Sequence, residues 1–291
     1  MSIWITGASG MLGNEVVAEC KRLGLDFSDS DAEVDISDAI ALRDFSEGKD
    51  IDFIINCAAY TAVDRAEQET DLAFRINAIG AGNLAKTAKR LGAGFIHVST
   101  DYVFDGKSNR PYRIDDGPSP VSAYGQSKLE GERAVLSANP DAAIIRTAWL
   151  YGRGGQNFVA TMLKLMGSRD EVRVVDDQRG SPTLADDLAR AIVEIVGSRR
   201  GAKGIYHFTN SGETTWLGFA SQIYKTASQH GLIKREVKLT PIKTADYPTP
   251  AARPAYSVLD CSRLVEEFDI VARPWAEALE DYLTRLAEVS A

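Results

Sequence analysis

Thr6-Gly7-Ala8-Ser9-Gly10-Met11-Leu12-Gly13, near the start of the sequence, is a glycine-rich segment between two regular patterns. It follows an apolar run typical of a buried strand, Ile3–Thr6, and opens an amphipathic helix predicted over Met11–Leu23. Glycine at position 7 permits a tight turn, glycine at 10 lets the backbone approach a pyrophosphate, and glycine at 13 allows close helix–sheet packing. A structural strand–helix turn is the plainer interpretation, but this context favours a phosphate-binding loop.

Beyond this loop, short apolar runs alternate with helical patterns. The strand-like runs are Ile3–Thr6, Asp52–Asn56, Phe95–Ser99, Ala143–Arg146, Val172–Val175 and Tyr206–Phe208, and the helical ones are Met11–Leu23, Leu72–Leu91, Ser127–Ser137 and Leu184–Val196. The alternation predicts an α/β fold, a doubly wound parallel sheet of the dinucleotide-binding Rossmann type. We expect a dinucleotide-binding domain of residues 1–150 plus about 171–208, and a smaller C-terminal substrate lobe of residues 151–170 plus about 209–291.

The acidic stretch after the first helix bears on the choice of dinucleotide. The second strand is expected near Leu25–Ser28, so Asp29, Asp31 or Asp35 could meet the adenosine ribose or the adenine. No lysine or arginine lies between residues 22 and 43 to meet a 2′-phosphate, which favours NAD(H). Nearby serines and backbone groups could accept NADP(H) instead, and a solvated loop is the alternative for the whole stretch.

Tyr124-Gly-Gln-Ser-Lys128 is the most informative motif. A helix through it places Tyr124 and Lys128 one turn apart on one face. Because an ammonium beside a phenol favours the phenolate, we expect Lys128 to lower the pKa of Tyr124. Such a tyrosine can give a proton to a developing alkoxide or take one from an alcohol. Alone, the spacing is typical of an exposed helix pair, but together with the glycine loop it becomes specific.

The predicted strand Phe95–Ser99 leads into Thr100 and Asp101. Ligands of an open parallel sheet bind at the carboxyl ends of its strands, where a hydroxyl can polarise a substrate carbonyl. Thr100 is therefore a candidate catalytic residue, with a turn or helix cap as the alternative for Ser99 and Thr100. His97, within the strand, is expected to be a packed histidine.

Composition excludes several classes of protein. The 291 residues include 33 basic and 41 acidic side chains, a net charge of −8, which argues against nucleic acid or an anionic membrane as a partner. No run approaches the ~18 apolar residues of a membrane span, and the first residues do not resemble a secretory signal. Three scattered cysteines suit a reducing cytoplasm, and no metal-ligand spacing supports a catalytic metal.

Six segments spread in order over almost the whole chain carry a family resemblance. They are Asn56-Cys-Ala-Ala-Tyr-Thr-Ala-Val-Asp64, Ser99-Thr-Asp-Tyr-Val-Phe-Asp105, Tyr124-Gly-Gln-Ser-Lys128, Arg146-Thr-Ala-Trp-Leu-Tyr151, Asp177-Gln-Arg-Gly-Ser-Pro-Thr183 and Tyr247-Pro-Thr-Pro-Ala-Ala-Arg-Pro254. Together they resemble the extended short-chain dehydrogenase/reductases and, among these, the dTDP-4-dehydrorhamnose reductases.

The resemblance implies reduction of the C4 ketone of dTDP-4-dehydro-L-rhamnose to dTDP-L-rhamnose, a donor for cell-surface polysaccharide, by exchangeable NADH or NADPH. It implies that Tyr124 protonates the O4 alkoxide, Lys128 holds the ribose and Thr100 orients the carbonyl. The cofactor residues it implies are Gly7, Ser9, Gly10, Met11, Leu12, Gly13, Asp35, Ile36, Ala58, Ala59, Tyr60, Asn77, Ser99, Tyr124 and Lys128. The substrate residues are Thr100, Asp101, Tyr102, Trp149, Asn157, Phe158 and Arg253.

The sequence allows alternative interpretations of two substrate residues, of the oligomeric state and of the function. Trp149 has an ordinary core tryptophan as its alternative, and Arg253 a surface arginine. Relatives occur as homodimers or monomers, and the resemblance allows Glu15 and C-terminal carboxylates of this chain to bind Mg2+ between subunits, as happens in some relatives. A 4-epimerase or a 4,6-dehydratase is a further candidate, although dehydratases of this superfamily usually carry Asp-Glu where this chain has Asp101-Tyr102. A non-catalytic NAD(P)-binding regulatory subunit is another, although the tyrosine, the lysine and the three glycines favour an enzyme.

Overall fold

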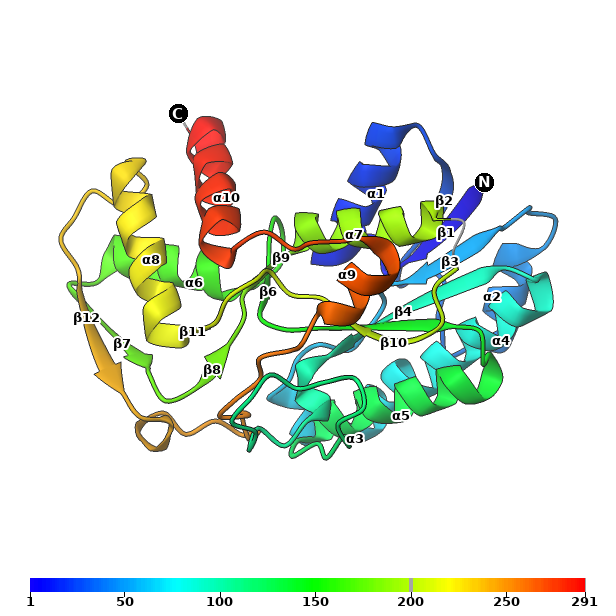
Figure 1. The fold of residues 1–291 in the computed structure, drawn as a ribbon, viewed down its shortest axis with the longest axis horizontal. Coiled ribbons are helices and arrows are strands. Elements are labelled where there is room, and N and C mark those ends of the chain that lie inside the picture. Colours follow the sequence, from blue (N-terminus) through cyan, green and yellow to red (C-terminus); the bar gives the residue numbers. More distant parts are fainter. Residues whose placement is uncertain (199–200, 291) are drawn as a thin grey trace.

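The computed structural model describes residues 1–198 and 201–290 (Figure 1). Its strands are β1 (Ser2–Thr6), β2 (Asp26–Ser30), β3 (Phe53–Asn56), β4 (Gly94–Thr100), β5 (Ala143–Thr147), β6 (Leu150–Tyr151), β7 (Glu171–Val175), β8 (Arg179–Gly180), β9 (Thr183–Leu184), β10 (Gly204–His207), β11 (Thr214–Thr215) and β12 (Lys238–Ile242). Its α-helices are α1 (Met11–Leu23), α2 (Ala39–Ser46), α3 (Thr70–Phe74), α4 (Ala81–Leu91), α5 (Ala123–Ala138), α6 (Phe158–Ser168), α7 (Ala185–Gly197), α8 (Trp216–Gln229), α9 (Ser262–Phe268) and α10 (Trp275–Ser290).

Six strands form one parallel sheet in the order β10-β5-β4-β3-β1-β2. From β1 the chain passes to β2 on one side and then to β3 on the other, so the order reverses between β1 and β3. The crevice outside the carboxyl ends of the strands at such a reversal is where open α/β sheets bind ligands. The expected doubly wound fold is confirmed.

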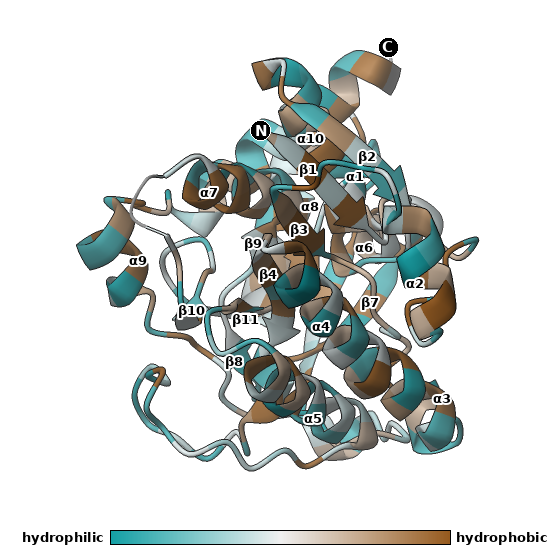
Figure 2. Cartoon of the chain, turned by 90° about the vertical axis from the view of Figure 1, so that its right-hand side faces the viewer, coloured by the Kyte–Doolittle hydropathy of each residue, from teal (hydrophilic) through white to brown (hydrophobic). Residues whose placement is uncertain are grey.

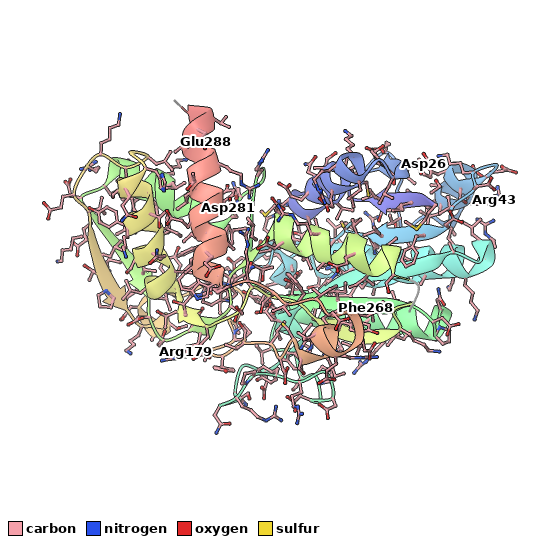
Figure 3. All side chains as sticks on the ribbon, turned by 45° about the horizontal axis from the view of Figure 1, so that its top comes forward. Asp26, Arg43, Arg179, Phe268, Asp281 and Glu288 are labelled. Carbon is pink, nitrogen blue, oxygen red and sulfur yellow. The ribbon has the colours of Figure 1, made fainter. Side chains whose placement is uncertain are left out.

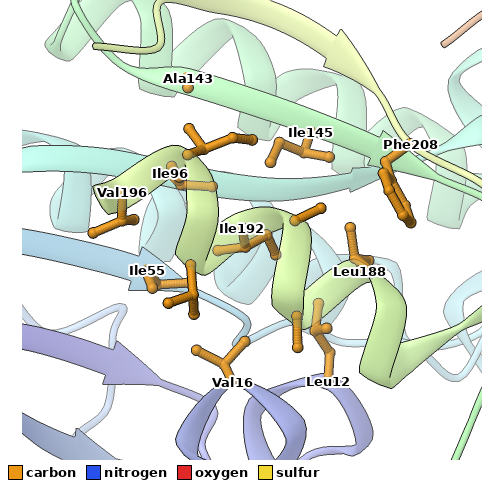
Figure 4. Packing of buried hydrophobic residues seen from close by; sticks show 14 of the residues in the cluster. Leu12, Val16, Ile55, Ile96, Ala143, Ile145, Leu188, Ile192, Val196 and Phe208 are labelled. Carbon is orange, nitrogen blue, oxygen red and sulfur yellow. The ribbon is translucent and has the colours of Figure 1, made fainter. Parts of the chain in front are cut away.

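Both faces of this sheet are buried, because successive strand residues point to opposite sides. Ile3 and Ile5 join a cluster beneath α1 and α7, whereas Trp4 joins a second cluster beneath α2 and α4. Figure 4 shows residues of the first cluster, with Val16 of α1 and Ile192 of α7 over the strands. Figure 2 shows apolar residues along β3 and β4 in the middle of the molecule. Burial on both sides explains why these strands read as continuous apolar runs.

The helix predicted over Leu72–Leu91 contains an irregularity. Between α3 and α4 the chain forms a π-helical segment, Arg75–Gly80. This segment approaches α5 at Gly131, where a Cβ would lie only 2.1 Å from the Asn77 carbonyl oxygen. Single π-helical turns of this kind are common beside functional sites.

A separate lobe is built from α6, α8, α10 and two-stranded pairs, and Figure 1 shows it at the opposite end from β2. The strand Val172–Val175 was expected in the dinucleotide-binding domain, and this is wrong. It belongs to β7, which pairs with β12, and Val172 and Val174 pack into the apolar cluster of the lobe. Because Glu171 before them and Arg173 between them are exposed, the strand has only one apolar face and does not suit a sheet covered on both sides.

The expected lobe boundary of residues 209–291 also needs correction. Leu264 and Phe268 of α9, together with Ile270, pack into the cluster of the main sheet beside Tyr206 of β10. Figure 3 labels Phe268 on this helix. The chain therefore returns to the first domain before α10 re-enters the lobe. Within residues 1–198 and 201–290, no helix is long and apolar enough to cross a membrane.

Candidate active site

The glycine loop has the shape that its sequence predicts. Gly7 has a φ of +68°, and a Cβ there would lie 2.5 Å from the backbone nitrogen of Ala58. A Cβ at Gly13 would lie 2.1 Å from the Gly7 carbonyl oxygen. Gly10 is the N-cap of α1, and none of the described side chains caps it. The N–H groups of the first turn are therefore available to an anion, which suits a dinucleotide pyrophosphate.

A pocket of about 380 Å³ opens beside this loop, at the carboxyl ends of β1, β2 and β3. It is lined by six of the residues expected at the cofactor, Gly7, Gly10, Asp35, Ile36, Ala58 and Ala59, and by Asp31, Ala32, Val34, Cys57, Arg75 and Ile76. The sequence had placed Asp31 among three alternatives for the ribose. It gave no indication of the others in the second group, because most of them have no polar side chain and Arg75 comes from the distant π-helical segment.

Charged side chains give this pocket two negative groups and one positive group. Asp31 accepts the backbone N–H of Ser9 at 2.7 Å, so its carboxylate stands at the phosphate loop. Asp35 accepts the N–H and the hydroxyl of Ser37 at 2.8 and 2.7 Å, and these bonds lower its pKa, with a smaller effect from Arg75. Although no cation lies between residues 22 and 43, which favoured NAD(H), the fold brings the guanidinium of Arg75 into the pocket.

Other residues expected at the cofactor are engaged within the protein. Leu12 is buried in the core beneath α7 (Figure 4). Asn77 accepts the Tyr60 N–H at 2.8 Å and donates to the Tyr60 carbonyl and to Ser127 Oγ. Asn77 thus ties the loop that carries Ala59 to helix α5.

Helix α5 presents the tyrosine–lysine pair. Ser122 caps the helix by accepting the N–H of Gly125, and both Tyr124 and Lys128 are buried. The Nζ of Lys128 donates to the carbonyl of Val98 at 2.7 Å, and it also lies 3.4 Å from His97 Nε2. Burial lowers the pKa of Lys128 to about 8.

The expected direction of the Tyr124 shift is wrong for this structure. Burial raises the pKa of Tyr124 to about 12, the charge of Asp101 acts in the same direction, and a hydrogen bond with Thr100 opposes them. Lys128 is directed toward β4 instead, where it bonds to Val98. Tyr124 is therefore a protonated phenol at neutral pH, which is the form that a proton donor needs.

Thr100 is a cap, the second of its two alternatives. Its hydroxyl accepts the Tyr102 N–H at 3.2 Å and donates to Asp101 Oδ1 at 3.0 Å, and its interaction with Tyr124 lowers the pKa of that phenol. Asp101 beside it is buried, which raises its pKa to about 6, and its Oδ2 has no hydrogen-bond partner among the described residues. The ring of Tyr102 meets that of Tyr124 edge-on at 5.4 Å.

Ser99 has a structural bond that the sequence did not suggest. Its hydroxyl donates to Glu132 at 2.6 Å, and Glu132 also forms a bidentate ion pair with Arg146 at 2.8 and 2.6 Å. The Arg146 and Glu132 side chains are only 2% and 3% exposed. This pair joins α5 to β5 directly behind the site.

Arg253 reaches the site from the far end of the chain. Its Nη2 pairs with Asp64 at 2.8 Å, and its guanidinium lies 6.0 Å from the centre of the Tyr102 ring. Its Nη1 is buried without a hydrogen-bond partner among the described residues. Asp64 is a positioning residue that the sequence search did not single out, although it ends a segment of the resemblance.

Trp149 stacks on Trp216 with 3.5 Å between ring centres, and Phe158 packs on Trp216 at 4.5 Å. Trp149 has a φ of +46°, and a Cβ at Gly180 would lie 2.4 Å from its ring. Such a backbone is strained for a residue other than glycine and is typical of functional sites. Asn157 caps α6 through Ala160 and donates to a loop carbonyl, so its amide is engaged locally.

The described residues also bear on the expectation of a magnesium site near Glu15 and the C-terminal carboxylates. Within the described residues, no group of three His, Cys, Asp or Glu side chains is arranged to hold a metal ion. Glu15 faces Asp186 as well as three arginines, Arg153, Arg190 and Arg285. On α10, Asp281 pairs with Arg273 and Arg285 (Figure 3).

Comparisons with known proteins agree over nearly the full length. A family model described as the RmlD substrate binding domain matches residues 1–288. The spore coat polysaccharide biosynthesis protein SpsK of Bacillus subtilis (strain 168) is 42% identical over 282 residues, covering 97% of this chain and 96% of that protein. A dTDP-4-dehydrorhamnose reductase of Sinorhizobium fredii is 42% identical over 287 residues, covering 96% and 95%.

A solved structure is also similar throughout. The dTDP-4-dehydrorhamnose reductase of Bacillus anthracis str. Ames, crystallised in complex with NADP, matches with a TM-score of 0.92 and 37% identity over 98% of this chain and 99% of that chain. The matches in sequence and structure run from the glycine loop to the last helix. This chain therefore belongs to the RmlD substrate-binding domain family, that of the dTDP-4-dehydrorhamnose reductases.

Proposed function

We propose that this chain reduces the C4 ketone of dTDP-4-dehydro-L-rhamnose to dTDP-L-rhamnose with NADH or NADPH. The observation that carries the proposal is the position of Tyr124 and Thr100 at the carboxyl end of β4. The chain belongs to this family, and its glycine loop has the conformation that dinucleotide binding requires. The three cysteines are free thiols, which is typical of a reducing compartment, so we infer the cytoplasm as the location.

Each catalytic side chain has a role that follows from its surroundings. When bound, the reduced nicotinamide supplies a hydride to the sugar C4. Tyr124 gives its phenolic proton to O4, which leaves a phenolate. Thr100, whose hydroxyl bonds to the Tyr102 N–H and to Asp101, interacts with that phenol and is placed to orient the carbonyl. Burial, and not Lys128, sets the pKa of the resting phenol. Once Tyr124 has given up its proton, the ammonium form of Lys128, one helical turn away, attracts the new phenolate charge.

The substrate would lie between the two parts of the chain. The unpaired Nη1 of Arg253 suits a diphosphate oxygen, since its Nη2 is already held by Asp64. The Trp149 ring and Tyr102 are the aromatic surfaces for the sugar. We propose that the lobe cluster around α6 and α8 supports these contacts.

Replacing Arg253 tests this assignment. Arg253→Ala should raise the KM for the sugar nucleotide by about tenfold to a hundredfold, because one charge-assisted hydrogen bond contributes about 1.5–3 kcal/mol. The KM for NADPH should not change, which makes it the internal control. An unaltered KM for the sugar nucleotide would show that Arg253 does not meet the substrate.

Arg75 is our candidate for the 2′-phosphate of NADPH, because it is the one cationic side chain among the described residues that line the pocket. Arg75→Ala should raise the KM for NADPH about tenfold relative to the KM for NADH, again the loss of one charge-assisted bond. Arg43→Ala is the matched control, since Arg43 is exposed on α2 and pairs with Asp44. An equal rise in the KM values for NADH and NADPH would show that Arg75 contacts a group common to both cofactors and not the 2′-phosphate.

Oxidation of NADH and NADPH, followed at about 340 nm, tests the proposed reaction itself. The substrate is formed in situ from dTDP-glucose by the preceding dehydratase and epimerase. We expect oxidation that requires both upstream enzymes and this chain. If neither NADH nor NADPH is oxidised, although the protein binds dinucleotide, the substrate is a different sugar nucleotide or the chain is a regulatory subunit.

A further inference from the structure

A row of buried polar side chains crosses the sheet behind the catalytic residues. Thr6 and Asn56 are register partners in β1 and β3, and Asn56 and His97 are partners in β3 and β4. All three are 1% exposed or less. The row ends on Lys128, which reaches it from α5. Buried polar groups are costly unless they are paired, so the direction of each hydrogen bond in the row is constrained.

The hydrogen bonds fix the tautomer of His97. The Ala58 backbone N–H and the Thr6 hydroxyl both donate to Asn56 Oδ1, at 3.0 and 2.9 Å. Because an N–H must meet an oxygen, the Asn56 amide nitrogen is the group that lies 2.9 Å from His97 Nδ1. Nδ1 is therefore an acceptor, and a neutral His97 carries its proton on Nε2. Burial and the charge of Lys128 lower the pKa of His97, which keeps it neutral.

The Nε2–H of His97 faces the Lys128 nitrogen at 3.4 Å. A neutral amine accepts this N–H with its lone pair, whereas an ammonium has only donors to offer. Both the ammonium and the neutral amine of Lys128 can donate an N–H to the Val98 carbonyl, so this bond does not distinguish the two forms. The contact with His97 therefore favours the neutral amine over the ammonium.

The other groups that face Lys128 do not supply a dedicated counter-ion. Glu132 acts on it from the next turn of α5, but both oxygens of Glu132 already bind Arg146 and one also binds Ser99. Cys57 acts on it from the loop after β3, and burial raises the pKa of that thiol to about 12. Asp101, directly after β4, acts on Tyr124 and not on Lys128.

We propose that His97 is a positioning residue of this reductase: Asn56 holds it as the Nε2–H tautomer, and it directs that N–H at Lys128 so that the amine is poised between its charged and neutral forms. This rests on the proposed function, in which the ammonium stabilises the Tyr124 phenolate. Turnover then falls as the pH rises and Lys128 loses its proton. The midpoint of that fall is the quantity that His97 sets.

Three substitutions separate this role from simple packing. In His97→Leu, which removes the N–H, the midpoint of the alkaline fall in kcat/KM should move up by about one pH unit. In His97→Glu, which supplies a counter-ion, it should move further in the same direction. In His97→Gln it should stay at the wild-type value, because the amide offers an acceptor to Asn56 and a donor to Lys128.

A second measurement does not need the sugar substrate. The pH dependence of the NADPH dissociation constant, followed by nicotinamide fluorescence, should show the same order of midpoints, since Lys128 is the residue expected to hold the ribose. Identical midpoints in all four proteins by both methods would refute the role of His97. If the four proteins show the expected order of binding midpoints but wild type shows no turnover, the proposed reaction is wrong and the inference on His97 stands. If the leucine variant does not fold, the comparison of glutamine with glutamate decides the question.

Discussion

Tyr124→Phe should turn over about 10²–10⁴-fold more slowly than wild type, the usual contribution of one positioned proton donor. The variant loses only the hydroxyl, so its ring keeps the edge contact with Tyr102 and its packing against Ala66, Ala73 and Ala123. Its affinity for NADPH should therefore be unchanged. The measurements are steady-state NADPH oxidation and a fluorescence titration with NADPH.

A second tyrosine gives the matched control. Tyr224→Phe removes a hydroxyl from α8 in the lobe, where it bonds to the Arg235 carbonyl, and should leave turnover at the wild-type rate. If Tyr124→Phe also retained full turnover, the proton would have to come from another group. Asp101 would be the first to test, since burial raises its pKa to about 6.

Glu132→Gln should destabilise the fold by about 3–5 kcal/mol, the usual consequence of removing one partner of a buried ion pair. The reason is that Arg146 would keep its charge in the core without a carboxylate, and its Nη1 already lacks a partner among the described residues. The free energy of unfolding from urea titration measures the effect.

The same helix supplies a matched control for this prediction. Glu130 pairs with Arg133 on the exposed side of α5, so Glu130→Gln should cost about 1 kcal/mol or less. Replacing both Glu132 and Arg146 with leucine should recover much of the loss, because the desolvation of both charges disappears. Equal losses for the Glu130 and Glu132 variants would mean that burial does not govern the contribution of this pair.

Local patterns were sufficient for the main features of the fold. The glycine loop, the alternation of apolar strands with amphipathic helices, and the Tyr124–Lys128 spacing each depend on neighbours a few residues apart. They predict correctly the parallel sheet, the loop before α1, and a helix that presents both residues on one face. The strand Val172–Val175 was misplaced for two reasons. The predicted apolar run did not include Glu171, the exposed residue before it. Its pairing also depends on β12, which lies far along the chain.

Tertiary packing controls how distant residues change one another's chemistry. The dinucleotide-binding fold, the family and the candidate residues Tyr124, Lys128 and Thr100 could be predicted from the sequence. The sequence did not determine that Arg75 lines the pocket beside the glycine loop or that Asp64 pairs with Arg253. Nor did it show that Lys128 bonds to β4 while burial keeps Tyr124 protonated. Proton affinities and free hydrogen-bonding groups depend on solvent exclusion and on atoms a few ångströms away, and these are set by how the sheet, α5 and the lobe pack together.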